Sequence, residues 1–137
     1  MTKIKLTLLI LAALTISGCS SEEDPMTDAE KYMADKYNAK WTDIVIRQTE
    51  TKKNGKVTEN RKYIAVQVKN SMDINRILEE GDYAEKRMKS VAQFVMDSVD
   101  LGKISFVPNE IEVEYIKEEG FFIFKNEIKQ TMAFNLD

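Results

Sequence analysis

The chain has 137 residues, a length that suits a single domain. Its 20 basic and 23 acidic side chains give a net charge of −3, which argues against nucleic acid as a partner because duplex binding depends on clustered Lys and Arg. A single Cys excludes an intramolecular disulfide, and the lack of His removes the usual general base and zinc ligand, so we expect no metal site and no cofactor.

Residues 1–18 have the organisation of a secretion signal. Lys3 and Lys5 precede an apolar run over 6–16, which is shorter than the roughly 20 residues that a membrane-spanning helix needs. The run ends in Ile-Ser-Gly-Cys at 16–19, which resembles the lipobox of bacterial lipoproteins, although that family usually has Leu where Ile16 stands. The resemblance implies cleavage after Gly18 and attachment of acyl chains to Cys19, so the bilayer is an expected partner. The alternatives are a plain secretory signal and an uncleaved anchor.

Residues 19–26 are expected to form the lipidated Cys and a flexible tether. Small and acidic residues lead to Pro25, a composition typical of linkers. Seven residues reach roughly 23 Å when they are extended, so the domain stays close to the membrane. The Ser-and-acidic cluster is similar to the export signal of Bacteroidota lipoproteins. We therefore expect an outer-membrane location, on the periplasmic or the cell-surface side, with a solvated linker as the alternative.

Residues 27–137 are interpreted as one domain that begins with a short helix. Thr27 and Glu30 have the spacing of a capping box, in which each side chain accepts a hydrogen bond from the other residue's backbone amide. Apolar residues at 29, 33 and 37 form one stripe, and Asn38 suits a left-handed stop. The pattern predicts a helix over about 28–38.

A β-hairpin is predicted over 41–68, with Asn54-Gly55 at its turn. A two-residue turn would pair Lys53 with Lys56, and a three-residue loop would pair Lys52 with Lys56. The second register sets Ile44 opposite Ile64 and brings the aliphatic side chains of both arms to one face. Because a one-residue slip exchanges the faces of a strand, we expect burial to select the second register.

Two helical stretches follow, and the second is the longest predicted element. The first begins at 70–73 and is interrupted at Gly81. The second runs over about 82–101, with a capping box at Asp82 and Glu85, a continuous apolar stripe and a stop at Leu101-Gly102. This helix is expected to organise the core.

The last third of the chain has the pattern of three strands. Apolar and acidic residues alternate over 111–115, an apolar segment covers 121–124 after a turn at Gly120, and alternation returns over 132–136. The order α-ββ-α-βββ predicts an α+β fold with two layers, an antiparallel sheet with helices packed on one face.

Three sets of residues are candidates for a site. The first set holds carboxylates that could act as acids or bases: Glu79, Glu80, Glu110, Glu112, Glu114, Glu118 and Glu119. The second holds basic side chains that could meet an anionic partner: Lys52, Lys53, Lys56, Lys86, Arg87 and Lys89. The third holds aromatics that could line a groove: Tyr32, Tyr37, Trp41 and Tyr63. Solvated surface or core packing is the commoner role for each set, so no catalytic, cofactor-binding or metal-binding residue is assigned.

The sequence therefore predicts a lipoprotein of the cell envelope in which Cys19 is the one assigned site residue. No motif in the domain resembles a known family. A non-enzymatic module that binds a protein or a small ligand is the preferred interpretation. The alternatives are a small hydrolase that uses carboxylates or a Ser–Lys pair, and a structural or inhibitor protein.

Overall fold

A computed structural model describes residues 25–98, 100, 106–121 and 123–136. The signal segment, Cys19 and most of the tether lie outside the described residues, as does the predicted stop at Leu101-Gly102. Three helices and four strands follow in the order α2 (Asp28–Lys36), β1 (Trp41–Lys53), β2 (Lys56–Lys69), α3 (Ile74–Glu79), α4 (Gly81–Ser98), β3 (Glu110–Phe121) and β4 (Phe124–Asn135). The predicted α+β class is confirmed.

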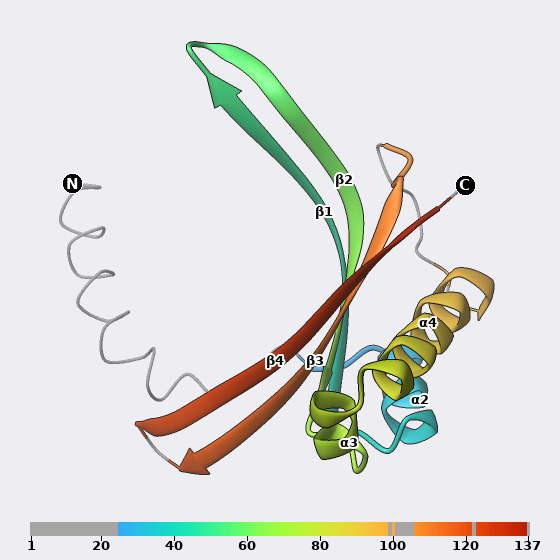
Figure 1. Ribbon diagram of the computed structural model, residues 1–137. Helices are drawn as coiled ribbons and strands as arrows, with labels where there is room; N and C mark the ends of the chain where they lie inside the picture. The colour runs from blue at the N-terminus through green and yellow to red at the C-terminus, as the bar shows by residue number, and fades with distance from the viewer. Residues whose placement is uncertain (1–24, 99, 101–105, 122, 137) are drawn as a thin grey trace, which may run out of the picture.

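The four strands form one mixed sheet in the order β1-β2-β3-β4 (Figure 1). The pairs β1–β2 and β3–β4 are antiparallel hairpins, whereas β2 and β3 run parallel. The expectation of a wholly antiparallel sheet is therefore wrong at the central pair. The reason is the connection through α3 and α4, which returns the chain to the level of Tyr63, so that β3 starts beside the middle of β2 and runs in the same direction.

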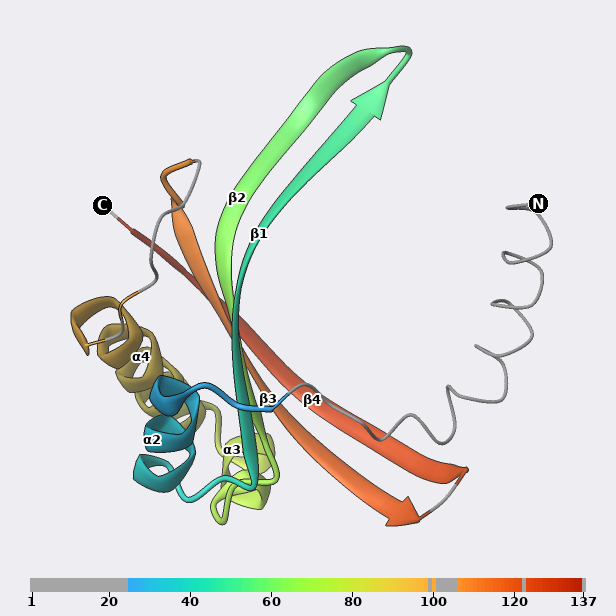
Figure 2. The same cartoon turned by 180° about the vertical axis from the view of Figure 1, so that it is seen from behind.

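The core lies between the helices and one face of the sheet. In Figures 1 and 2 the three helices lie together beside that face. Alternate side chains of β2 and β3 stack in register against them, with Ile64 beside Ile111 and Val66 beside Val113. The apolar stripe of α4 supplies the facing surface through Met88, Val91 and other fully buried side chains.

Helix α2 begins with the predicted capping box. The Thr27 hydroxyl accepts from the Glu30 amide at 3.2 Å, and the Glu30 carboxylate accepts from the Thr27 amide at 2.7 Å. Asn38 has a φ of 52°, in the left-handed region expected of a helix stop. The helix is a little shorter than predicted, because Tyr37 already lies outside it as the C-cap.

The first hairpin confirms the predicted face but corrects the predicted register. Lys53 pairs with Lys56 around a two-residue turn, in which Asn54 and Gly55 both have positive φ. The register then shifts at Thr51/Lys52, because Thr58 is an extra residue on β2, and Ile44 comes opposite Val66. The bulge thus reconciles the favoured Asn-Gly turn with burial of the aliphatic face, a solution that neither predicted register included.

The second helical region divides at Gly81, close to the predicted interruption. Asp82 lies within the first turn of α4 rather than at its N-cap, and the Ala84 amide bonds the Glu80 carbonyl at 2.9 Å. The capping box predicted at Asp82 is therefore wrong, because the helix starts at Gly81, two residues earlier than an N-cap at Asp82 requires. None of the helices in the described part of the chain is long and apolar enough to cross a membrane.

The last part of the chain contains two long strands where three short ones were predicted. Residues 117–119 continue β3 beyond the core instead of forming a loop. The apolar segment near 121–124 forms the hairpin end, where Phe121 pairs with Phe124, rather than a buried strand of its own. Gly120 has a φ of 94°, and an added Cβ there would lie 1.9 Å from the Phe124 carbonyl oxygen. The close backbone approach explains why Gly stands at this position.

Candidate binding surface

The helix-free face of the sheet carries the polar half of the strand alternation. Glu110, Glu112 and Glu114 lie here, while Ile111, Val113 and Tyr115 between them are fully buried in the core. The carboxylate series is thus the solvent side of a half-buried strand, as the commoner interpretation expected.

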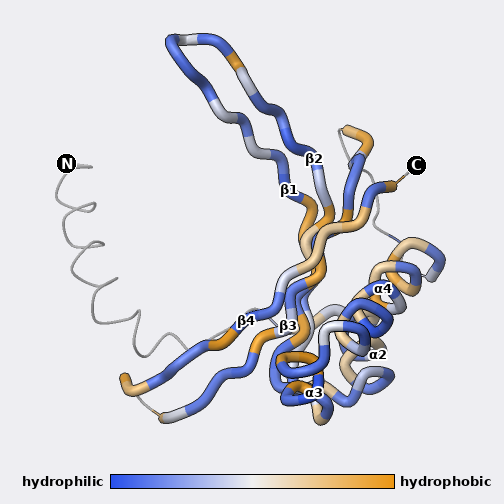
Figure 3. The backbone as a smooth tube through the Cα atoms, viewed as in Figure 1, coloured by the Kyte–Doolittle hydropathy of each residue, from blue (hydrophilic) through white to orange (hydrophobic). Residues whose placement is uncertain are grey.

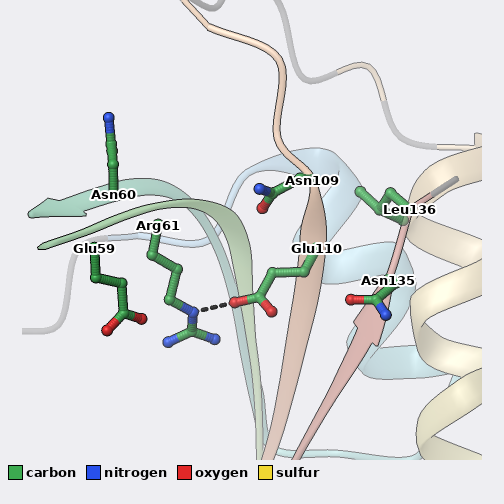
Figure 4. A pocket seen from close by; sticks show the side chains of 7 residues that line it. All are labelled: Glu59, Asn60, Arg61, Asn109, Glu110, Asn135 and Leu136. Carbon is green, nitrogen blue, oxygen red and sulfur yellow. Dashed lines mark hydrogen bonds and ion pairs between the residues drawn. The ribbon is translucent and has the colours of Figure 1, made fainter.

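Arg61 holds two of these carboxylates together. Its guanidinium bonds Glu110 through Nε (Figure 4). The same group bonds Glu112 through Nη2 at 2.7 Å. It also lies 4.0 Å from the centre of the Tyr63 ring. The hydrogen bond to Glu112, together with Glu110, raises the pKa of Arg61 and keeps it charged. Arg61 therefore neutralises the repulsion between two adjacent acids at the start of β3.

Glu114 is held in the same manner by several polar neighbours. Gln67 donates to one of its oxygens at 2.9 Å, and Thr131 lies 3.3 Å from the other. Lys129 lies 4.0 Å away. Because each carboxylate of the series has a defined partner, the arrangement ties three strands together across the sheet.

The outer half of the first hairpin, residues 48–62, projects beyond the rest of the sheet, and we call it the arm (Figure 1). The pairing of β2 with β3 begins only at Tyr63 and Glu110. Among the described residues, the arm therefore has no neighbouring strand on either side, apart from the Asn109 amide that bonds the Lys62 carbonyl at its base. Every residue of the arm except Val57 is polar, charged or Gly.

The first edge of the arm belongs to β1, and within the described residues the outward backbone amides of β1 have partners only before the arm begins. The Thr42 amide donates to the Met26 sulfur at 3.4 Å, and the Ile44 amide donates to the Glu30 carboxylate at 2.7 Å. Alternate amides of a strand point the same way, so those of Ile46 and Gln48 also point outward. A groove of about 540 Å³ lies where this cover stops, lined by residues 27–30, residues 44–46 and Asp100.

Both carboxylate oxygens of Glu30 accept hydrogen bonds at that edge, from the backbone amides of Thr27 and Ile44. Burial raises its pKa, but the backbone amides of Thr27 and Ile44 bond the carboxylate and outweigh that effect, so the pKa of Glu30 lies below its usual value. Asp43 is the counterpart: burial, followed by its hydrogen bond to Glu30 and the Glu30 charge, raises the pKa of Asp43. The pair thus holds α2 against the edge of β1.

The second edge of the arm opens where β3 begins and β4 ends. The Lys62 carbonyl accepts from the Asn109 amide at 2.9 Å, which marks the side of β2 that faces β3. The backbone groups of Asn60 point to that side and extend past the end of β3. A groove of about 420 Å³ lies here, and Figure 4 shows its lining side chains: Glu59, Asn60, Arg61, Asn109, Glu110, Asn135 and Leu136. Both edges of the arm therefore emerge beside a groove.

The remaining candidate residues do not gather into a site. Lys52, Lys53 and Lys56 remain exposed at the arm's tip, whereas Arg87 is separated from Lys86 and Lys89 by its ion pair with Asp73, 3.0 Å away. The four aromatics have separate roles: Tyr32 stacks on Phe94, Tyr37 bonds Ser90, Tyr63 lies under Arg61 and Trp41 under Lys69. These four aromatics therefore do not line a common groove, and packing, the commoner role, describes them better.

A polar cluster that sequence reasoning missed lies beneath α3 and α4. The Asp73 carboxylate accepts from the Tyr83 hydroxyl at 2.7 Å and from Arg87, while Tyr115 is fully buried nearby. Burial raises the pKa of Tyr115 well above its usual range. Within the described residues its hydroxyl has no hydrogen-bond partner. The cluster is enclosed in the packing of the helices on β3, away from both grooves.

The described residues contain no group of three acidic or other ligating side chains that could hold a metal ion. Comparison of the chain with protein-family models, with curated proteins and with solved structures gave no match.

Proposed function

We propose that this protein is a lipid-anchored, non-enzymatic binding module of the cell envelope, whose arm binds an extended segment of a partner protein by strand addition. The observation that carries the proposal is the arm itself, a two-stranded ribbon that, within the described part of the chain, has an open edge on each side and a groove at the root of each edge. An open edge offers a row of backbone donors and acceptors to a new strand.

The polarity of the arm supports a regulated rather than an indiscriminate contact. Exposed edges invite aggregation, and natural proteins protect them with charged side chains and bulges. The arm has both, with a bulge at Thr58 and three Lys residues at its tip. Five basic and two acidic residues within 48–62 give the arm a net charge of +3, although Arg61 is already paired with Glu110 and Glu112. The remaining excess favours a partner segment that is acidic.

The stability of the arm also favours a partner. Isolated two-stranded ribbons are marginally stable in water, because only one row of backbone bonds opposes the loss of chain entropy. An added strand would supply a second row of such bonds. The arm is thus poised to gain order when a partner binds.

The anchor part of the proposal rests on the lipobox resemblance at 16–19. Substitution Cys19→Ala should move the protein from the detergent-extractable membrane fraction to the soluble fraction. Cys19→Ser is a matched control that replaces only the sulfur and should behave alike. Full membrane retention of both variants would contradict anchoring through Cys19.

The strand-addition part can be tested by prolines placed at outward-facing positions. Pro lacks a backbone N–H, so at these positions it blocks an edge and keeps the backbone bonds between the two strands, although either substitution removes the side-chain hydrogen bond from Gln48 to Asn60. With a photo-cross-linker at Lys56 in intact cells, we expect a discrete adduct that is lost with Asn60→Pro or with Gln48→Pro, according to the edge used. Asn60→Ala and Gln48→Ala keep the amide and should retain the adduct. An adduct that survives both prolines would overturn strand addition.

A further inference from the structure

The end of the second hairpin exposes a concentrated apolar surface. Nine large hydrophobic side chains are exposed in the described part of the chain, and four of them belong to this end. These are Phe121, Ile123, Phe124 and Ile128, with exposures of 70%, 76%, 74% and 48%. We call these four residues the apolar tip. In Figure 3 the start of β4 at the hairpin end is orange, whereas the arm is mostly blue.

Three members of the apolar tip lie on one side of the hairpin. Phe121 pairs directly with Phe124, and Ile128, four residues along the same strand, shares the face of Phe124. Closer to the middle of the sheet, the same face packs against the helices through Val113 and Met132. The apolar face therefore continues past the helices to the end of the hairpin, where its side chains are exposed.

Charged residues beside the apolar tip balance one another. Lys117 lies 2.8 Å from Glu119, Lys125 lies 3.4 Å from Glu118, and Lys129 lies 3.8 Å from Glu127. Residues 117–129 contain three basic and three acidic side chains, a net charge of zero. An apolar surface with balanced charges around it suits the boundary between the headgroups and acyl chains of a neutral bilayer better than a strongly charged partner.

The sheet topology places the apolar tip and the arm at opposite ends of the molecule. Because β2 and β3 run parallel, the turn before β2 and the turn after β3 lie at opposite ends (Figure 1). Thr42, which contacts Met26, is level with Val68, Tyr115 and Gln130 in the sheet. From that level the apolar tip lies about 20 Å along β3, and the turn of the arm lies about 36 Å in the other direction along β1.

The length of the preceding chain connects the apolar tip to the anchor. The separation of Met26 from the apolar tip is about 25 Å, because the roughly 20 Å along β3 and the three strand spacings of about 4.8 Å across the sheet are at right angles to each other. Met26 follows Cys19 by seven positions, and seven residues reach roughly 23 Å when extended. Acyl chains on Cys19 and the apolar tip can therefore reach one membrane surface, and the arm then points away from it.

We propose that the apolar tip inserts into the interface of the lipid bilayer and orients the anchored domain with its arm away from the membrane. The orientation rests on the proposed anchoring at Cys19, whereas insertion of the apolar tip does not. Aromatic and aliphatic side chains gain free energy when they leave water for the acyl-chain boundary. The neutral surroundings predict that insertion depends little on anionic lipid or salt.

The test uses the full lipidated chain, purified and reconstituted in phosphatidylcholine vesicles. Trp41→Phe removes the one native Trp. In that background Phe124→Trp should be quenched strongly by lipids brominated on their acyl chains, with emission shifted to the blue. Val57→Trp, which labels the exposed apolar residue of the arm, is the matched control and should be unaffected. Circular dichroism of both variants shows that the fold is retained.

A second measurement separates this proposal from the anchor. Unlipidated Cys19→Ala protein should bind the same vesicles weakly, and Phe121→Ser with Phe124→Ser should lower that partition by at least roughly tenfold, since each side chain contributes apolar burial. An unquenched Trp at 124 in protein whose intact mass includes acyl chains would overturn insertion and leave anchoring intact. Shielding of that Trp only in native membranes that contain protein would also overturn it, in favour of a protein partner. A free thiol at Cys19 with strong quenching would overturn the anchor alone.

Discussion

The two hairpins of this protein belong to one sheet, but their ends differ in polarity, in turn structure and in how their edges are paired. The arm is polar, carries its turn on Asn54-Gly55 and, as far as the described residues go, has no neighbouring strand on either edge. The β3–β4 hairpin packs its inner half into the core, and its outer half carries charged residues that lead to an apolar end. The comparison shows how one fold can present two chemically distinct ends, because the parallel pairing of β2 and β3 separates the two turns.

The hairpins also differ in how their turns are built. Gly55 has a φ of 78°, and a Cβ added there would meet no other atom within 4 Å, whereas a Cβ at Gly120 would lie 1.9 Å from the Phe124 carbonyl oxygen. Gly55→Ala should therefore cost about 1 kcal/mol of unfolding free energy from backbone strain alone. Gly120→Ala should cost more, about 2 kcal/mol, because the backbone must also shift. Chemical denaturation of both variants measures the difference.

Equal costs for the two glycine variants would contradict the close approach at Gly120. The same pair of variants sharpens the functional comparison. A distorted end of the second hairpin should weaken vesicle binding while leaving cross-linking through the arm unchanged, and Gly55→Ala should do the reverse.

The next largest loss of unfolding free energy is expected at Arg61, where the arm joins the rest of the sheet. Arg61→Met removes the charge that holds Glu110 and Glu112 together but keeps much of the apolar stem. We expect a loss of about 1.5 kcal/mol, as for hydrogen bonds between charged groups that are partly buried. The loss should shrink at high salt, because screening weakens both the lost attraction and the uncovered repulsion. Stability that is insensitive to this change would show that the contacts with Arg61 contribute nothing.

The smallest expected change in stability concerns Asp43, beside the edge of β1 that α2 covers, and this change depends on pH. The pKa of Asp43 is raised in the folded state, so ionising Asp43 costs stability as the pH rises through that pKa. Asp43→Asn should therefore stabilise the protein by about 0.5 kcal/mol at neutral pH, the lower range of one hydrogen bond. The gain should vanish at a pH low enough to protonate Asp43 in both states. Thermal unfolding across a pH range from about 3 to about 8 tests the sign, and destabilisation at neutral pH would contradict it.

Local patterns in the sequence predict much of the fold. The capping box at Thr27 and Glu30, the Asn54-Gly55 turn, and the buried face of β1 and β2 all follow from short-range chemistry, and the structure confirms them. The bulge at Thr58 escapes prediction because two local preferences conflict, and only the whole sheet can resolve that conflict. Parallel pairing of β2 with β3 escapes it because strand order depends on contacts between distant parts of the chain.

The candidate surfaces are harder to predict from the sequence than the fold is. Arg61 carries no local sign that it faces Glu110 and Glu112, which are some fifty positions away. The apolar segment at 121–124 has the pattern of a buried strand, because hydrophobicity alone does not distinguish a core strand from an exposed hairpin end. The Gly at 120 and the charged residues on both sides are the available signals of an exposed turn.

Amide hydrogen exchange along the arm of the free protein reports directly on whether its two edges are open. If both edges are open, the outward amides of Ile46, Gln48 and Asn60 exchange much faster than the inward amides of Arg47, Thr49 and Arg61, which bond across the ribbon. Residue-resolved NMR shows this alternation without knowledge of the partner. Equal protection of both sets would mean that the edges are already covered, and equally rapid exchange of both would mean that the arm is not formed; either result would contradict the open-edged ribbon.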